Sequence, residues 1–190
     1  MKTALKLICL LFCCNIAHGQ NNLSIKAQVD SIRYLKGDAA FDCNSVIWRI
    51  IAKNKEPVPY LIALISDSTT IPVPYRCKRE KDMNVGDMAY YILDQILTVP
   101  LGPIAERQFH VYDNGCLTAE YDYIEENRST LQGKIQKWYA QYKDKLIWCE
   151  YTEDGLTDCR RKNNIVGYYL WVYEYPKPVP EKKEAKQKKK

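Results

Sequence analysis

Apolar side chains recur at helical spacing over much of the chain. The clearest example lies in residues 129–145, where polar residues fill one side and the other side carries Leu131, Ile135, Trp138 and Tyr142. This spacing is typical of an amphipathic helix with one buried face. The same pattern predicts about five helices in all, over residues 21–38, 44–53, 57–67, 84–97 and 129–145.

Local signals support these helix boundaries. Residues 84–87, Asn-Val-Gly-Asp, form a capping-box pattern in which Asp87 takes the place usually held by glutamate. Pro57 suits a first helical turn, because the N–H that proline lacks would be unsatisfied there in any case. Pro100 is expected to end the helix that begins at residue 84.

The pattern changes after residue 145. Residues 146–151 are strand-like, 153–155 predict a turn, and 158–161 predict the returning strand of a hairpin. A final strand is expected over 165–175, which is rich in aromatic and β-branched residues. The predicted architecture is therefore mainly α, either stacked helices or a small irregular bundle, with a small C-terminal antiparallel β-ribbon.

Two further stretches do not have a helical pattern. Residues 68–82 hold Pro72, Pro74 and a charged run, which predicts a loop or a sheet edge. Residues 109–112 predict a short extended piece, and the Asp-Asn-Gly sequence of residues 113–115 predicts a turn after it.

Two of the predicted helices resemble those of a known family. The sequences Pro-Val-Pro-Tyr-Leu-Ile-Ala-Leu-Ile-Ser-Asp at 57–67 and Val-Gly-Asp-Met-Ala-Tyr-Tyr-Ile-Leu at 85–93 are similar to helices of HEAT-like repeat proteins. The chain has no clear repeat of about 40–47 residues, which that family shows. The resemblance implies a stacked-helix surface for binding and assigns no functional residue.

The first nineteen residues have the pattern of a secretory signal peptide. Lys2 and Lys6 accompany an apolar run over 5–14, and the small-x-small sequence at 17–19 predicts cleavage before Gln20. We therefore expect an exported protein, periplasmic or extracellular, that is not membrane-spanning. Two alternatives remain open for this segment: a buried N-terminal helix, or a lipid anchor at Cys13 or Cys14.

Cleavage would leave one globular domain, residues 20–176, followed by a lysine-rich tail, 177–190, that we expect to be disordered. The chain carries a net charge of +5, but the signal segment supplies +2 and the tail +5, which leaves −2 for the domain. A near-neutral domain argues against nucleic-acid binding. The tail either solubilises the protein or contacts an anionic surface through Lys182, Lys183, Lys186, Lys188, Lys189 and Lys190.

Cysteines outside the signal segment are expected to pair in an oxidising compartment. Cys149 and Cys159 lie on the two arms of the predicted hairpin, where facing Cα atoms are about 4.5–5.5 Å apart, within the range of a disulfide. They are the favoured pair. The pairing of Cys43, Cys77 and Cys116 stays open, as does the alternative of five free thiols.

The motifs of several site classes are absent from the sequence. It has no Cys-x-x-Cys pair for zinc and no glycine-rich loop for nucleotides, so no metal or cofactor is predicted. His110 is the only histidine left after cleavage, and a Cys–His catalytic pair with Cys116 is disfavoured because no nucleophile motif accompanies it. Two acidic clusters provide candidate carboxylates for a hydrolase: Glu120, Asp122, Glu125 and Glu126, and Glu150, Glu153, Asp154 and Asp158.

Aromatic composition favours binding over catalysis. Fifteen tyrosines and four tryptophans stand against three phenylalanines, and these side chains suit both ordinary packing and binding surfaces. Tyr168, Tyr169, Trp171 and Tyr173 are the candidate binding residues. The sequence therefore predicts a secreted or periplasmic non-catalytic module whose partner is another protein, with an inhibitor or immunity protein as one version. The alternatives are an envelope hydrolase using one of the acidic clusters and a structural envelope-associated protein.

Overall fold

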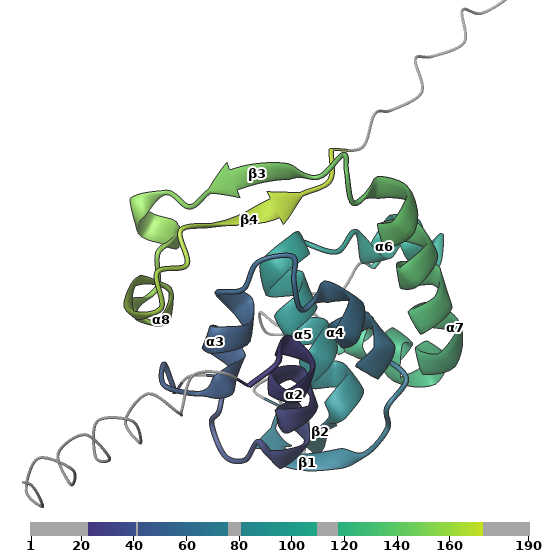
Figure 1. Ribbon diagram of the computed structural model, residues 1–190. Helices are drawn as coiled ribbons and strands as arrows, with labels where there is room; N and C mark the ends of the chain where they lie inside the picture. Colours follow the sequence, from purple (N-terminus) through teal and green to yellow (C-terminus); the bar gives the residue numbers. More distant parts are fainter. Residues whose placement is uncertain (1–22, 41, 76–80, 110–117, 173–190) are drawn as a thin grey trace, which may run out of the picture.

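The computed structural model describes residues 23–40, 42–75, 81–109 and 118–172 (Figure 1). Within these ranges the chain forms seven α-helices and two antiparallel sheets of two strands each, which confirms the mainly α architecture with small ribbons. The predictions for other segments lie outside the described residues. These are the signal peptide, Cys77, residues 110–117 with His110 and Cys116, Tyr173 and the lysine tail.

Three short helices build the N-terminal part. They are α2 (Ile25–Asp30), α3 (Val46–Ile51) and α4 (Val58–Leu64), with a 3₁₀ turn, η1 (Ser31–Tyr34), after α2. The helix predicted over 21–38 is thus shorter, because Leu35 is already extended after η1. Pro57 precedes α4 as its N-cap, at the helix start that the sequence predicts.

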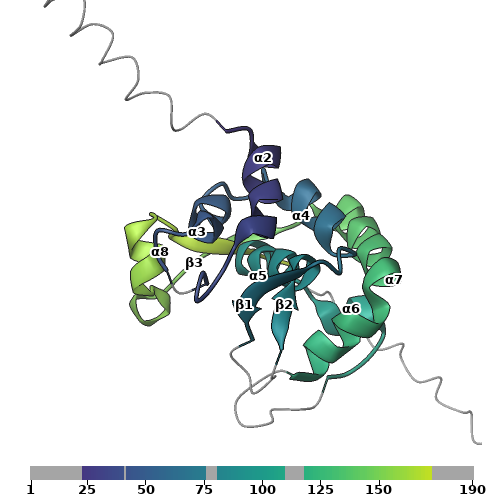
Figure 2. The ribbon, with the colours of Figure 1, turned by 90° about the horizontal axis from the view of Figure 1, so that it is seen from below.

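The central helix is α5 (Val85–Leu97), which both views place among α3, α4 and α7 (Figures 1 and 2). Met88, Ile92 and Leu93 are completely buried, and most of the other residues of α5 are buried too. A helix that is buried on nearly every side lies inside the fold. The predicted capping box is confirmed, and the Asn84 N–H donates to an Asp87 carboxylate oxygen at 3.0 Å.

One ribbon joins β1 (Thr70–Pro74) to β2 (Asp82–Asn84), in the stretch predicted as a loop or edge. Along β1 the side chains of Ile71 and Val73 are buried, and those of Pro72 and Pro74 are exposed. Because of this alternation, the apolar face of β1 packs on the core. The prolines suit a strand that pairs with β2 alone in its sheet.

The longest helix, α7 (Thr118–Tyr142), begins eleven residues before the predicted helix and follows the short α6 (Leu101–Ala105). Its buried stripe reaches back through Arg128 to Ile124. A charged side chain on the stripe interrupts the apolar pattern, which is why the sequence places the start too late. The acidic cluster at 120–126 therefore lies on the helix rather than before it.

The C-terminal part differs from the predicted hairpin. The strand predicted over 146–151 is confirmed as β3 (Ile147–Glu150), but its partner is β4 (Gly167–Leu170), with Cys149 opposite Tyr168. After a 3₁₀ turn, η2 (Glu153–Gly155), the chain forms helix α8 (Asp158–Lys162) where a strand was predicted. The Thr157 side chain accepts from the Arg160 N–H and caps this helix, a role for which threonine is well suited.

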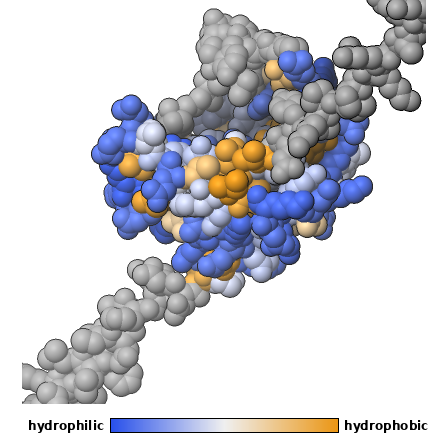
Figure 3. Space-filling model, turned by 90° about the horizontal axis from the view of Figure 1, so that it is seen from above, coloured by the Kyte–Doolittle hydropathy of each residue, from blue (hydrophilic) through white to orange (hydrophobic). Residues whose placement is uncertain are grey.

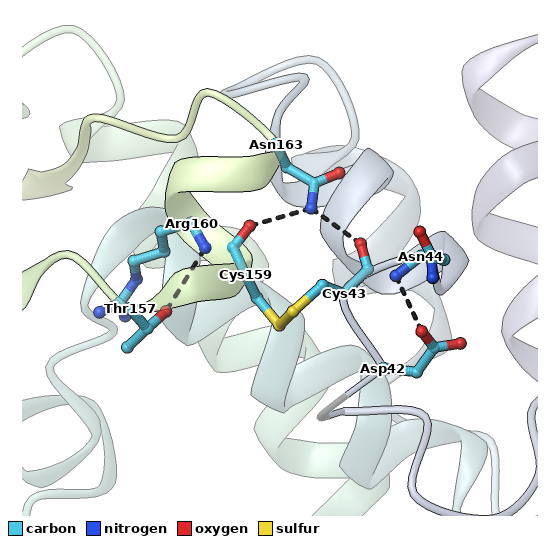
Figure 4. Close-up of a disulfide and its surroundings, with 7 residues drawn as sticks. All are labelled: Asp42, Cys43, Asn44, Thr157, Cys159, Arg160 and Asn163. Carbon is cyan, nitrogen blue, oxygen red and sulfur yellow. Dashed lines mark hydrogen bonds between the residues drawn. A yellow bond between two sulfur atoms is a disulfide. The ribbon is translucent and has the colours of Figure 1, made fainter.

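This helix also corrects the predicted disulfide. Cys159 on α8 pairs with Cys43, just before α3, with Cα atoms 4.6 Å apart (Figure 4). The Asn163 side chain donates to the backbone oxygens of Cys43 and Cys159, at 2.9 Å each. Cys149 is a free thiol, because its strand partner is Tyr168 and α8 carries Cys159 away from β3. The favoured Cys149–Cys159 pairing is therefore wrong.

Candidate functional site

Three aromatic rings from distant parts of the chain cluster beside α6. Trp138 and Tyr142 lie one turn apart on α7, and Trp171 directly follows the end of β4. The ring centroid of Trp171 lies 6.3 Å from that of Trp138 and 5.0 Å from that of Tyr142. These are separations of favourable aromatic contact, so the cluster joins the C-terminal ribbon to α7.

A pocket of about 640 Å³ opens at this cluster, and we call it the aromatic groove. Its volume lies within the range of about 300–1,000 Å³ that is typical of ligand sites. The groove is bounded by α7, by α6 with the residue that follows it, and by Trp171. Its lining residues are Pro103, Ile104, Glu106, Lys134, Lys137, Trp138, Gln141, Tyr142 and Trp171.

The charge around the groove is mainly positive. Lys134 and Lys137 are three residues apart on α7 and therefore lie on the same side of that helix. The Nζ atom of Lys145 lies 5.7 Å from the ring centroid of Tyr142. Glu106 is the acidic residue of the lining. Flat apolar surfaces with cations beside them are suited to bind a group that is both apolar and negatively charged.

Trp138 contributes a further polar group to the cluster. Its side chain is buried, and its Nε1–H has no hydrogen-bond partner among the described residues. Buried indole N–H groups usually have a partner. Sequence reasoning assigned Trp138 and Tyr142 to the buried stripe and so missed them as site residues. The available signal was a tryptophan and a tyrosine that end the stripe beside two lysines.

The candidate binding aromatics of the sequence are not brought together. Strand alternation separates Tyr168 from Tyr169. Tyr169 lies against the Trp148 ring at 4.9 Å, with the Lys55 Nζ over its own ring at 4.2 Å. Tyr168 contacts Tyr151 instead, at 5.0 Å. Of the four, Trp171 is the residue that lines the groove, and Tyr173 lies outside the described residues.

A second pocket of about 550 Å³ lies beyond α6 and contains one carboxylate of the predicted clusters, Glu120. Burial raises the pKa of Glu120, and the negative charge of Asp94 raises it further. Burial also raises the pKa of Asp94, although the Val99 N–H that donates to it at 2.8 Å opposes the shift. The remaining lining residues are Gly102, Pro103, Glu106, Arg107, Gln108 and Phe109.

The other acids of the two clusters are exposed. Glu125 forms an ion pair with Lys81, and its neighbours Asp122 and Glu126 are exposed. All four acids of the second cluster are exposed, on β3, η2 and α8: Glu150, Glu153, Asp154 and Asp158.

The acid most deeply buried in the described chain belongs to neither cluster. Asp87, at the start of α5, accepts from the Arg128 Nη2 at 2.5 Å and from the Tyr75 hydroxyl. Arg128 lies on α7 and Tyr75 follows β1, so the carboxylate joins three elements. A buried charge that is paired and hydrogen-bonded in this way organises the core.

Among the described residues, no group of three or more His, Cys, Asp or Glu side chains is placed to hold a metal ion. The same part of the chain contains no helix with the length and apolar composition needed to cross a bilayer. Comparisons with protein-family models, curated proteins and solved structures found no match to this chain.

Proposed function

We propose that this protein is an exported, non-catalytic module that binds a segment of another protein in the aromatic groove. The observation that carries the proposal is the groove itself, in which Trp138, Tyr142 and Trp171 flank a space of about 640 Å³. Aromatic anchors of this kind dominate the energetics of protein interfaces. The disulfide between Cys43 and Cys159 is compatible with export, because such bonds persist outside the reducing cytosol.

The positive charge around the aromatic groove indicates which kind of partner segment would bind there. Lys134, Lys137 and Lys145 outnumber Glu106 around the rings, so an apolar side chain flanked by a carboxylate is favoured. A basic segment would place like charges together and would be disfavoured. The expected ligand is therefore an apolar-acidic stretch of a partner protein.

Two peptide libraries test this assignment. They share the same apolar residues and differ in carrying aspartate or lysine beside them, and binding is measured by fluorescence polarisation. The acidic library is expected to bind more tightly, and the Lys134→Glu/Lys137→Glu variant should reverse the preference. Lys53→Glu is the matched control, since Lys53 is exposed and outside the groove. Equal binding of both libraries by the parent protein would remove the proposal.

The Trp171→Ala variant tests whether the peptides bind in the aromatic groove or elsewhere on the surface. The substitution opens the aromatic cluster and should weaken binding of the acidic peptides by at least about tenfold, as expected for a hot-spot aromatic. Retained circular dichroism would show that the fold persists. Unchanged affinity in a folded Trp171→Ala protein contradicts binding in the groove.

Hydrolysis is the second candidate function, favoured by the raised pKa of Glu120 in the second pocket. A carboxyl group that holds its proton to higher pH suits the role of general acid, and Glu106 lines the same pocket as a second carboxylate. Release of reducing ends from envelope polysaccharide is the assay. Activity that disappears in Glu120→Gln supports this function, and an inactive parent protein contradicts it.

A further inference from the structure

The C-terminal ribbon leaves one strand edge open. The Tyr151 N–H donates to the Val166 oxygen at 2.9 Å, in register with the pair Cys149–Tyr168. Hydrogen bonding alternates along an antiparallel strand, so Cys149 also bonds to β4, and the backbone groups of Trp148 and Glu150 point the other way. No third strand of the described chain joins this sheet. The outward groups of β3 are therefore a ready template for another strand.

β3 lacks several of the features that usually protect such an edge, although it is only four residues long and ends in the charged Glu150. It contains no lysine and no proline, and its register with β4 is regular. Ile147 is 53% exposed and Trp148 is 37% exposed. Figure 3 looks down on the side of the molecule that carries β3 and β4 and shows an apolar patch there. β1, in contrast, carries two prolines.

We infer that β3 pairs edge to edge with β3 of a second copy of this chain, about a two-fold axis at Cys149. In this register Trp148 of each copy lies opposite Glu150 of the other, and both positions direct their backbone groups across the new ladder. The result is a four-stranded antiparallel sheet in the order β4-β3-β3-β4. An identical strand satisfies every outward group in the pair by symmetry.

Charge disfavours one neighbouring register, and the free thiol favours this one. Glu150 is the one charged residue of β3, and the axis at Cys149 keeps the two copies of Glu150 apart. An axis at Glu150 would bring these like charges face to face, which destabilises a sheet. Cys149 faces its own equivalent in a non-hydrogen-bonded pair, where Cα atoms are about 4.5 Å apart, within disulfide range.

The dimer does not require a covalent bond, but the geometry allows one. With glutathione disulfide as oxidant, one Cys149 thiolate attacks the glutathione disulfide and releases a glutathione thiolate. The Cys149 thiolate of the second copy then attacks this mixed disulfide and releases the second glutathione. The two Cys149 thiols lose two protons and two electrons in all, and glutathione disulfide is reduced to two thiols.

The first test is cross-linking of the purified full chain. Under reducing conditions, sedimentation should show a concentration-dependent monomer–dimer equilibrium. Glutathione disulfide should then yield a dimer on a non-reducing gel, whose linked peptide joins Cys149 to Cys149 by mass spectrometry. Cys149→Ser should sediment as the parent does but give no such product. A monomer at every concentration, or a dimer that never links through Cys149, overturns the inference.

The second test uses backbone chemistry. Glu150→Pro removes one outward N–H from each copy and leaves the β3–β4 ladder intact, because that N–H points away from β4. The dimer dissociation constant should rise by about tenfold or more. Val166→Lys, on the ribbon face, should leave it nearly unchanged. Dissociation by Val166→Lys but not by Glu150→Pro would mean that the faces stack, and the inference fails.

Hydrogen exchange in the parent protein tests the same pairing without the proline variant, so the pairing can still be tested if that variant fails to fold. The amides of Trp148 and Glu150 in the parent protein should exchange more slowly as protein concentration rises, while those of β1 should not change. Exchange at these two amides that is independent of concentration also overturns the inference. The aromatic groove plays no part in this pairing, so either proposal can fail without the other.

Discussion

The β1–β2 and β3–β4 ribbons are each a pair of short antiparallel strands, yet their apolar side chains lie in different surroundings. In β1 the apolar residues Ile71 and Val73 face the core, and prolines occupy two of the three exposed positions. In β3 the apolar residues Ile147 and Trp148 remain accessible, and the inward side of the ribbon is held by aromatic contacts such as that between Trp148 and Tyr169.

The way each ribbon is attached differs as well. The β1–β2 ribbon is held by noncovalent core contacts and by the Tyr75 hydroxyl, which donates to the buried Asp87. The β3–β4 ribbon is held by α8, which is covalently tied to Cys43, and by Arg160, which stacks on Tyr151 at 4.1 Å and donates to Gln95 on α5 at 2.7 Å. A ribbon that keeps apolar surface in water needs such outside attachment, because its own burial stabilises it less.

Among the changes that test this difference between the ribbons, removal of the disulfide should lower the unfolding free energy most. The Cys43→Ser/Cys159→Ser variant should lose about 4–5 kcal/mol of unfolding free energy, because the bond closes a loop of more than one hundred residues in the unfolded chain. Urea denaturation measures the loss. Amides of β3 and β4 should also exchange faster, relative to those of β1, than in the parent protein.

Cys149→Ser is the matched control for this variant. Its thiol is free and half-buried, so the unfolding free energy of the monomer should change by less than about 1 kcal/mol. Equal stability of the double variant and the parent would show that the ribbon does not depend on its covalent tie.

Loss of the buried carboxylate of Asp87 should have the next largest effect, and this effect concerns the β1–β2 ribbon. Asp87→Ala removes the partner of Arg128 and the acceptor of the Tyr75 hydroxyl, and it breaks the capping box of α5. Leaving an arginine buried without its carboxylate costs about 3–5 kcal/mol. Urea denaturation should show a loss of this size.

The exposed ion pair between Lys26 and Asp30 provides the control, since both side chains are accessible. Asp30→Ala should cost less than about 1 kcal/mol, as is usual for surface pairs. Similar losses for Asp87→Ala and Asp30→Ala would mean that the buried network does not anchor the β1–β2 ribbon.

The two regions also differ in how far the sequence predicts them. Helices α3, α4 and α5 follow from apolar spacing and from residues that act locally, such as Pro57 and the capping box at Asp87. The first turns of α7 were missed because Arg128 occupies a buried position, and only a partner distant in sequence, Asp87, makes that position favourable. A pattern of apolar residues cannot register a charge that is neutralised by tertiary contact.

The C-terminal part depends even more on distant contacts. The short stretch at 158–161 fits a strand or a helix, and its cap at Thr157 together with Cys43, far away in sequence, decides for the helix. The aromatic groove was missed for a similar reason. Trp138 belongs to the helical stripe that the sequence reveals, but Trp171 reaches it only through the path of β4. The resemblance to HEAT-like helices stays a prediction.

A methyl group added inside the β3–β4 ribbon should have an intermediate effect. A Cβ atom at Gly167 would collide with the Cys149 carbonyl oxygen and lie 2.6 Å from the Trp148 ring. Gly167→Ala should therefore cost about 1–3 kcal/mol by overpacking. Urea denaturation measures this cost. Gly133→Ala, where the added atom meets nothing within 4 Å, is the control and should be neutral or slightly stabilising. Equal unfolding free energies for the two variants would show that the ribbon accommodates the added methyl group without loss of stability.

The smallest effect is expected where the two ribbons differ most in burial. Ile147→Thr exchanges an exposed apolar side chain on β3 for a polar one with high strand propensity, so the unfolding free energy of the monomer should change by less than about 0.5 kcal/mol. The same exchange at Ile71, which is buried in β1, should cost about 1–3 kcal/mol, since it removes apolar contacts and buries a hydroxyl. Both changes are measured by urea denaturation at a concentration where the protein is monomeric. A large loss at Ile147 would mean that this residue supports the monomer itself, so its exposure would no longer mark a surface kept for a partner.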